Sequence, residues 1–194
     1  MPCNQLKMHT KTCGYINAMK NQETIQIDLP INDPDVLEPN QSIQQVLKTF
    51  NVQQQLLKQA AFDHQSGKLL LQLDSHSVQT IDINPRDLMQ IDFGELNVTG
   101  IIITALYNSE VDIISRYFTP WQGVDEDHVT GSAHAVLGSY YVKTNQLPDQ
   151  KQITAFQASK RTGILYLTVN YQKKRILVSG HAKTFLKGTV VYKV

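Results

Sequence analysis

Apolar and polar positions follow two different periods along the chain, and the changes of period predict its elements. Period-two alternation and runs of β-branched residues are typical of strands, and a spacing of three to four is typical of helices. A loop with three prolines, between positions 30 and 39, predicts a boundary after the first strands. The predicted strands are 10–19, 23–29, 68–73, 100–106, 112–119, 153–158, 164–170 and 175–179, with one or two more within 183–193.

Three segments carry the helical spacing instead. The first is predicted to begin at the N-cap Ser42, and the second opens at Pro85, because proline fits a first helical turn. The third and longest helix, about 131–143, spaces its apolar residues as one stripe that faces the core: Ala133, Val136, Leu137, Tyr140 and Tyr141. Strands on both sides of one long helix predict an α+β domain wrapped around that helix, not a β–α–β array.

Composition narrows the class of protein. The chain has 194 residues, of which 41% are hydrophobic and 18% charged, with a net charge of +1, as expected of a soluble globular protein. This charge argues against binding of nucleic acid through a basic face. The two cysteines, Cys3 and Cys13, have no CxxC spacing and predict neither a zinc site nor a disulfide framework. With no signal-peptide pattern and no apolar run of membrane-spanning length, a cytoplasmic location without a membrane partner is expected.

The candidate chemistry is concentrated in GVDEDHVTGSAHAVLGSYY, from Gly123 to Tyr141. Three consecutive carboxylates, Asp125, Glu126 and Asp127, precede a turn of small residues and the long helix. In a functional interpretation, one carboxylate holds or moves a proton while the helix N-terminus binds an anion. In a structural interpretation, the acids form an exposed loop that caps the helix and favours its dipole. The spacing alone leaves both interpretations open.

Three side chains near this turn have the same two interpretations. Ser132 either donates a hydrogen bond to a ligand carboxylate or caps the helix. His134 is either an acid/base group or a buried histidine bonded to the backbone. Arg161 either meets an anionic substrate or the acidic loop, or lies on the surface. The histidines show no metal-ligand spacing, so no metal site is expected, and the chain has no glycine-rich phosphate loop or dinucleotide fingerprint.

Four stretches together carry a family resemblance. They are TKTCGYINAMKNQETIQIDLP (10–30), SRYFTPWQGVDEDHVTGSAH (115–134), QASKRTGILYLTV (157–169) and RILVSGHAKTFLKG (175–188). These stretches resemble the phenazine-biosynthesis PhzF-like family, and the resemblance covers nearly the whole chain. The resemblance implies the diaminopimelate-epimerase fold, in which two α+β halves each curve a sheet around a central helix. Residues 31–185 would form the second half, and 1–30 with about 186–194 a remnant of the first.

The resemblance also implies an activity and a site. Family members are cofactor-independent, and the characterised phenazine enzyme is an isomerase that moves a proton on a dihydro-hydroxyanthranilate. The ligand lies in the cleft between the halves, so the implied partner is a small carboxylate-bearing substrate. Asp127 and Ser132 match the family's catalytic cleft residues. The implied substrate-binding residues at the helix start are Gly131, Ser132, Ala133 and His134.

Departures from the family pattern lead to two hypotheses. His128 stands where the family usually has proline, and the family's Ser-Glu-Thr-Ala-like segment, with its acid/base glutamate, has no counterpart here. One hypothesis is an N-terminally truncated isomerase; the alternative is an inactive binding or interaction module derived from such an enzyme. In both, segment 10–29 is expected to expose an apolar face and unpaired edges, which favours self-association, with a homodimer as one form of it.

Overall fold

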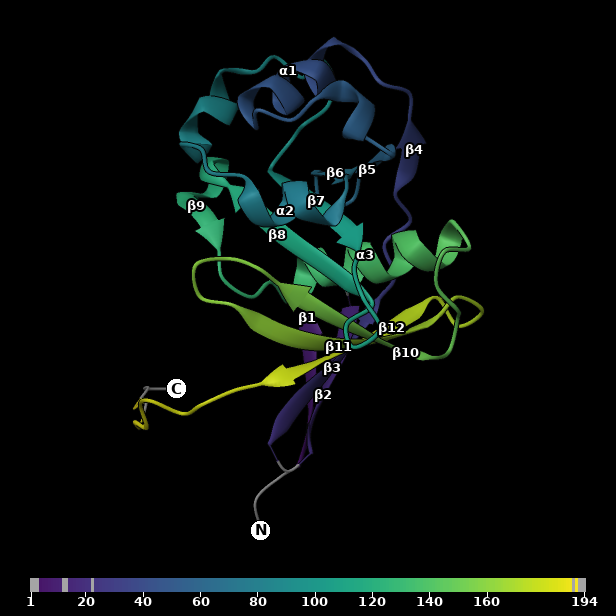
Figure 1. Ribbon diagram of the computed structural model, residues 1–194. Coiled ribbons are helices and arrows are strands. Elements are labelled where there is room, and N and C mark those ends of the chain that lie inside the picture. The colour runs from purple at the N-terminus through teal and green to yellow at the C-terminus, as the bar shows by residue number, and fades with distance from the viewer. Residues whose placement is uncertain (1–3, 12–13, 22, 190, 192–194) are drawn as a thin grey trace.

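A single mixed sheet runs through the protein. The computed structural model describes residues 4–11, 14–21, 23–189 and 191. In this part of the chain the sheet has twelve strands, and Figure 1 shows it curving around one long helix. The strands are β1 (Gln5–Thr10), β2 (Gly14–Asn21), β3 (Thr24–Pro30), β4 (Asp35–Leu37), β5 (Gln59–Asp63), β6 (Lys68–Gln72), β7 (Gly100–Leu106), β8 (Ile113–Thr119), β9 (Val124–Asp127), β10 (Gln152–Gln157), β11 (Gly163–Asn170) and β12 (Arg175–His181).

The order of the strands explains how distant segments meet. Along the sheet they follow β1-β2-β3-β12-β11-β10-β8-β7-β6-β5-β4, and β9 pairs with β8 outside this path. The pairs β8–β10 and β6–β7 are parallel, whereas the other neighbours are antiparallel. The helices are α1 (Gln41–Thr49), α2 (Ser75–Thr80) and α3 (Gly131–Lys143), with short 3₁₀ turns η1 (Gln54–Leu56), η2 (Pro85–Gln90) and η3 (Pro120–Gln122).

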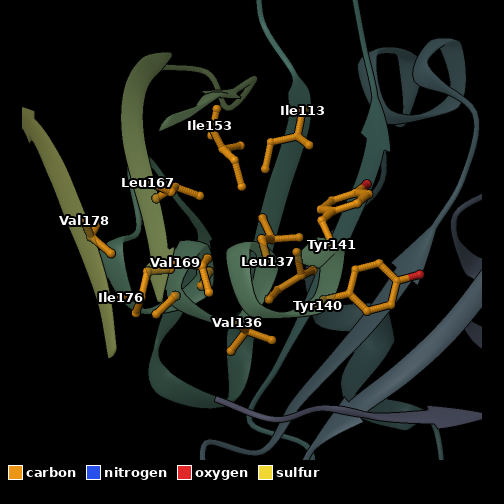
Figure 2. Close-up of a cluster of buried hydrophobic side chains, with 14 of the residues drawn as sticks. Ile113, Val136, Leu137, Tyr140, Tyr141, Ile153, Leu167, Val169, Ile176 and Val178 are labelled. Carbon is orange, nitrogen blue, oxygen red and sulfur yellow. The ribbon is translucent and has the colours of Figure 1, made fainter. Parts of the chain in front are cut away.

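The helix α3 lies inside the curve of the sheet and is buried on all sides. Every residue from Ala133 to Val142 is buried, so the predicted apolar stripe is confirmed but forms only part of the contact. Figure 2 shows Leu137 and Val136 among side chains of β11 and β12. A Cβ atom on Gly138 would lie 2.7 Å from Ile176 Cδ1, so this glycine lets β12 approach the helix closely. The α+β prediction is confirmed.

A second hydrophobic cluster fills the opposite face of the sheet. Alternation divides β6 between the faces, because Leu70 points toward α3 while Leu69 and Leu71 join the second cluster. The helices α1 and α2 and the turn η2 cover this face (Figure 1). The predicted first helix is present, but its N-cap is Asn40, whose Oδ1 accepts from the N–H of Ile43 at 3.0 Å, and not Ser42.

Elements with weak sequence patterns differ from the prediction. The chain forms β1, β4, β5, β9 and α2, which are not among the predicted elements. Residues 183–189 form no strand, although one or two strands were predicted within 183–193. The strand β12 ends where its last residue, His181, pairs with the first residue of β3, Thr24, so β3 offers no further partner there. Both cysteines, Gln22 of the predicted turn, and residues 190 and 192–194 lie outside the described residues.

The three-stranded unit β1–β2–β3 extends from the body of the protein (Figure 1). Its apolar face is open, with Leu6 56% and Ile25 40% exposed, so the predicted exposed apolar face is confirmed. The predicted unpaired edges of segment 10–29 are wrong, because β2 and β3 each have a neighbouring strand on both sides. The strand β3 pairs along its length with β12, which joins this unit to the main sheet. The division into 1–30 with about 186–194 and 31–185 stays a prediction. None of the helices in the described part of the chain is long and apolar enough to cross a membrane.

Candidate functional site

The three consecutive carboxylates lie on a strand and not in a loop. The strand β9 pairs with β8, with Asp127 opposite Tyr117 and Glu126 opposite Phe118. Successive side chains of a strand point to opposite faces, so Glu126 lies on the face of Phe118 while Asp127 lies on the face of α3. The interpretation of these acids as an exposed loop is therefore wrong, and the pairing gives adjacent acids different surroundings.

Two of the acids are held by arginines. Glu126 accepts two hydrogen bonds from Arg116, at 2.7 and 2.9 Å, and both side chains are only 12% exposed. Arg116 also donates to the carbonyl of Ile81, so this forked pair ties β9 to the end of α2. Asp125 meets Arg86 at 3.3 Å with both side chains largely in solvent, where an ion pair contributes little.

Asp127 is the acid that lies at the start of α3. Its Oδ1 accepts from the backbone N–H of His128 at 2.9 Å, and its Oδ2 accepts from the hydroxyl of Thr130 at 2.5 Å. The residue is half-buried, so one carboxylate is held by local donors while part of it faces solvent. These two bonds fix the direction of the carboxylate.

The first turn of α3 leaves its backbone donors open. The hydroxyl of the N-cap residue Thr130 donates to Asp127, and the Thr130 side chain makes no capping hydrogen bond to the helix. The N–H groups of Gly131, Ser132 and Ala133 donate to no other described residue, and the Ser132 side chain is exposed. No carboxylate of β9 accepts from this turn, so the capping interpretation of the acids is wrong. The helix dipole places partial positive charge at these three groups.

His134 is enclosed at the base of the same turn. Its ring has no exposed surface, and Nδ1 lies 2.8 Å from the carbonyl oxygen of Thr130. A carbonyl only accepts, so Nδ1 carries the proton, and Nε2 accepts from the Ser115 hydroxyl at 3.3 Å. Burial lowers the pKa of His134 to about 4, against a smaller opposing effect of its bond to Thr130. The ring is therefore neutral at pH 7 and supports the turn, whereas its predicted contact with substrate stays a prediction.

The strand entrance at 157–163 packs beneath this turn. The buried Gln157 side chain accepts from the N–H of Thr130 at 2.7 Å and donates to the carbonyl of Asp127 at 2.8 Å. The Ser159 hydroxyl donates to the carbonyl of His128 at 2.7 Å. A Cβ atom on Gly163 would lie 2.5 Å from a methyl group of Val129, so only glycine lets the two segments approach this closely.

These supporting contacts were not predicted from the sequence. The resemblance singled out the segment that contains Gln157, Ser159 and Gly163, yet nothing in the spacing showed that it touches the turn thirty residues earlier. Arg161 is exposed, in agreement with its surface interpretation. His128 lines a pocket of about 250 Å³ with Lys160 and Asp125, together with Glu126, on the other side of β9. In the ranges that the structure describes, no three His, Cys, Asp or Glu side chains gather as metal ligands would.

The chain matches a known protein family. The family model described as phenazine biosynthesis-like protein matches residues 8–188. A phenazine biosynthesis-like domain-containing protein from Bos taurus is 32% identical over 186 residues, which are 91% of this chain and 62% of the relative. An uncharacterised isomerase from Halalkalibacterium halodurans is 31% identical, with 96% of this chain and 64% of the relative covered. The chain thus spans less than two thirds of the length of these relatives.

Solved structures agree on the fold. A PhzF-family phenazine biosynthesis protein from Enterococcus faecalis superimposes with a TM-score of 0.78 at 27% identity, covering 99% of this chain and 66% of that one. A predicted epimerase from Pseudomonas aeruginosa superimposes with a TM-score of 0.68 at 13% identity, covering 95% of this chain and 68% of that one. At 13% identity, the Pseudomonas aeruginosa structure shows a similarity of fold alone. The two structures together confirm the epimerase-like fold that the sequence predicted.

Proposed function

Because the chain belongs to the family of phenazine biosynthesis-like proteins, we propose that it carries one wall of an isomerase site at the start of α3. The substrate is a small molecule that bears a carboxylate. Asp127 transfers the proton, and Ser132 assists as a hydrogen-bond donor. The observation that carries the proposal is the pairing of a half-buried carboxylate with three open backbone donors on the same turn.

The chemistry follows from these two kinds of group. The N–H groups of Gly131, Ser132 and Ala133 receive the substrate carboxylate, since a helix start favours negative charge. Asp127 removes a proton from a nearby carbon, and the electron pair of the broken C–H bond moves toward the carboxylate. The charge that develops there is stabilised by the same preorganised donors. Return of the proton to another position completes the isomerisation, with no electron gained or lost and no cofactor needed.

The second acid/base group of the isomerisation lies outside this set of residues. Asp125 and Glu126 form ion pairs away from the helix start. In the described part of the chain, Asp127 is therefore the carboxylate of β9 that lies at the helix start. We propose that the glutamate that the family resemblance implies would approach from the opposite wall of a cleft. An isolated chain would then bind substrate and exchange a proton through one group, but complete the isomerisation poorly.

A binding or interaction module is the second candidate. The open apolar face of β1–β2–β3, with Leu6 and Ile25 exposed, favours it, because soluble proteins rarely leave a continuous sheet face uncovered. Such a module would hold a small carboxylate at α3 without turning it over, and a homodimer is one way to cover the face. Under both candidates we propose a cytoplasmic protein without nucleic-acid or membrane partners.

Exchange of protons with solvent tests the proposal on the chain as it exists. Exchange needs one group that removes and returns a proton, so Asp127 alone suffices. The chain is incubated in heavy water with a panel of small carboxylates, such as proline, lactate and cyclohexadiene carboxylates, and deuterium incorporation is measured by mass spectrometry. Asp127→Asn is expected to lower the exchange rate about 100-fold or more. Asp125→Asn, which removes an exposed carboxylate two residues away, is the matched control and should leave the rate unchanged.

The outcomes separate the candidates. Exchange that is lost in Asp127→Asn supports the isomerase site. Binding of a carboxylate at α3 without exchange favours the binding module. If neither binding nor exchange occurs, or if Asp127→Asn exchanges as fast as the unchanged chain, the proposed role of Asp127 is wrong.

A further inference from the structure

Two side chains that the proposed chemistry does not use connect Asp127 to the helix. They are Thr130, the N-cap of α3, and Gln157, the last residue of β10. We propose that Thr130 and Gln157 are positioning residues, which hold the Asp127 carboxylate in one orientation against the start of α3. This inference rests on the proposed function, since it gives the two residues a role in proton transfer by Asp127.

The orientation of the Gln157 amide follows from its partners. Its Oε1 lies 2.7 Å from the backbone nitrogen of Thr130, which only donates, and its Nε2 lies 2.8 Å from the carbonyl oxygen of Asp127, which only accepts. Rotating the amide by half a turn would place two donors together and two acceptors together. The side chain has no exposed surface, so no water can replace these bonds at little cost.

The Thr130 hydroxyl extends the same chain of hydrogen bonds. The second Nε2 proton of Gln157 points to Thr130 Oγ1, at 3.3 Å, and the hydroxyl proton then points to Asp127 Oδ2, at 2.5 Å. Each bond polarises the next in the same direction, which strengthens the set. With Oδ1 bonded to the N–H of His128, each carboxylate oxygen has a fixed donor. Rotation of the Asp127 side chain would break at least one of these bonds.

This arrangement separates the position of the base from the binding of the anion. The N–H groups of residues 131–133 stay in place as long as α3 is folded, whatever the direction of the Asp127 carboxylate. Loss of the Thr130 hydroxyl frees the carboxylate to rotate, and displacement of a reacting group by about 1 Å lowers rates far more than it lowers affinity. The expected signature of a positioning residue is therefore a slower exchange step with nearly unchanged binding.

The variants are chosen to remove one bond at a time. Thr130→Val keeps the shape and removes the hydroxyl, while Thr130→Ser restores a hydroxyl at the same place. Gln157→Met keeps the length of the side chain and removes its polar atoms. Gln72→Met is the matched control, because Gln72 is also a buried, hydrogen-bonded glutamine that contacts α3, but at its other end.

Two readouts are followed in each variant: the rate of deuterium incorporation, and the affinity for benzoate from the amide shifts of residues 131–133. Thr130→Val and Gln157→Met should lower the exchange rate about tenfold or more and change benzoate affinity less than threefold. Thr130→Ser should recover most of the rate, and Gln72→Met should keep it. Equal rates in Thr130→Val and the unchanged chain would overturn the inference, as would equal losses in Gln157→Met and Gln72→Met.

A third readout keeps this test distinct from that of the proposed function. If the unchanged chain neither binds benzoate nor exchanges protons, the proposed function fails. The positioning contacts are then tested by NMR alone: the Gln157 side-chain amide protons should exchange slowly with solvent. The carboxyl carbon resonance of Asp127 should move in Thr130→Val and return in Thr130→Ser. Rapid exchange of the Gln157 side-chain amide protons would overturn the inference by itself. So would an Asp127 carboxyl resonance that has the same position in both variants and in the unchanged chain.

Discussion

The two ends of α3 use the same kinds of residue to opposite effect. At the C-terminal end, the Tyr140 hydroxyl lies 2.6 Å from Gln59 Oε1 and 2.7 Å from Gln72 Oε1, and Gln146 is bonded to Gln72 in turn. Burial raises the pKa of Tyr140 to about 12, so the Tyr140 hydroxyl keeps its proton at pH 7. At the N-terminal end, Gln157 is as well bonded as Gln72, yet it leaves the donors of the first turn open.

The two ends differ in whether their polar groups have hydrogen-bond partners within the protein. A buried polar group without a partner is costly, so the end under β5 and β6 has its polar side chains bonded. The helix start lies at the surface of the same core and keeps a half-buried carboxylate beside open N–H groups. Backbone donors that stay open at the start of α3 alone are what we expect if that end binds a ligand.

The largest effect should come from the ion pair that fixes β9 beside the helix start. Arg116→Met leaves Glu126 buried without its partner and should lower the free energy of unfolding by about 3 kcal/mol. Arg86→Met removes the exposed pair with Asp125 and should cost less than about 1 kcal/mol. Urea denaturation of the two variants measures the difference, and equal losses would mean that the Arg116 pair does not anchor β9.

Substitutions at the C-terminal end of α3 should change the stability of the protein but not its affinity for benzoate. Tyr140→Phe removes the hydroxyl that bonds the buried Gln72 and the half-buried Gln59, and should lower the free energy of unfolding by about 2 kcal/mol. Tyr141→Phe removes a single bond, to Thr104 at 3.1 Å, and should cost about 1 kcal/mol. Both variants should keep the benzoate affinity of the unchanged chain. A large loss of affinity in either would show that the two ends are not independent.

The enclosed histidine gives the N-terminal end a pH dependence. His134 has a pKa of about 4 in the folded protein and 6.5 as its ordinary value, so on acidification the unfolded chain takes up a proton first. Its contribution to stability is complete above pH 6.5, is lost as the pH falls toward 4, and changes no further below that. Between pH 7 and pH 4.5 the loss should be on the order of 2 kcal/mol.

His134→Asn removes this titration while its amide keeps a donor for the Thr130 carbonyl. The variant should therefore lose less stability than the unchanged chain over the same interval, as measured by urea denaturation at both pH values. Groups such as Asp33, whose pKa is lowered chiefly by its bond to Lys143, titrate in both proteins and cancel in the comparison. The same loss in both proteins would contradict the assignment of a neutral buried ring.

The smallest effect should come from Ser132. Its exposed hydroxyl has no partner among the described residues, so Ser132→Ala should leave the free energy of unfolding unchanged within about 0.5 kcal/mol. If the hydroxyl donates to a bound carboxylate, the variant should bind benzoate about three- to tenfold more weakly. Unchanged affinity would remove Ser132 from the site and leave the backbone donors as its anion-binding groups.

Strong local patterns were readable from the sequence, and long-range contacts were not. The helix at 131–143 was predicted with its bounds because its apolar residues recur at the helical spacing. The strand β9 was missed because Val-Asp-Glu-Asp has no apolar alternation, and only pairing with β8 makes it a strand. The contact of Gln157 with Asp127 joins residues thirty positions apart, a relation that depends on the order of strands in the sheet.

A titration of the ¹⁵N-labelled chain with benzoate, followed through its backbone amide resonances, shows whether the start of α3 binds an anion. We expect saturable shifts that are largest at Gly131, Ser132 and Ala133 and near zero at Asp125, on the other side of the turn. Benzamide, which has the same shape without the charge, should produce none of them. Shifts that are absent at the start of α3, or equal for benzoate and benzamide, would contradict an anion site there.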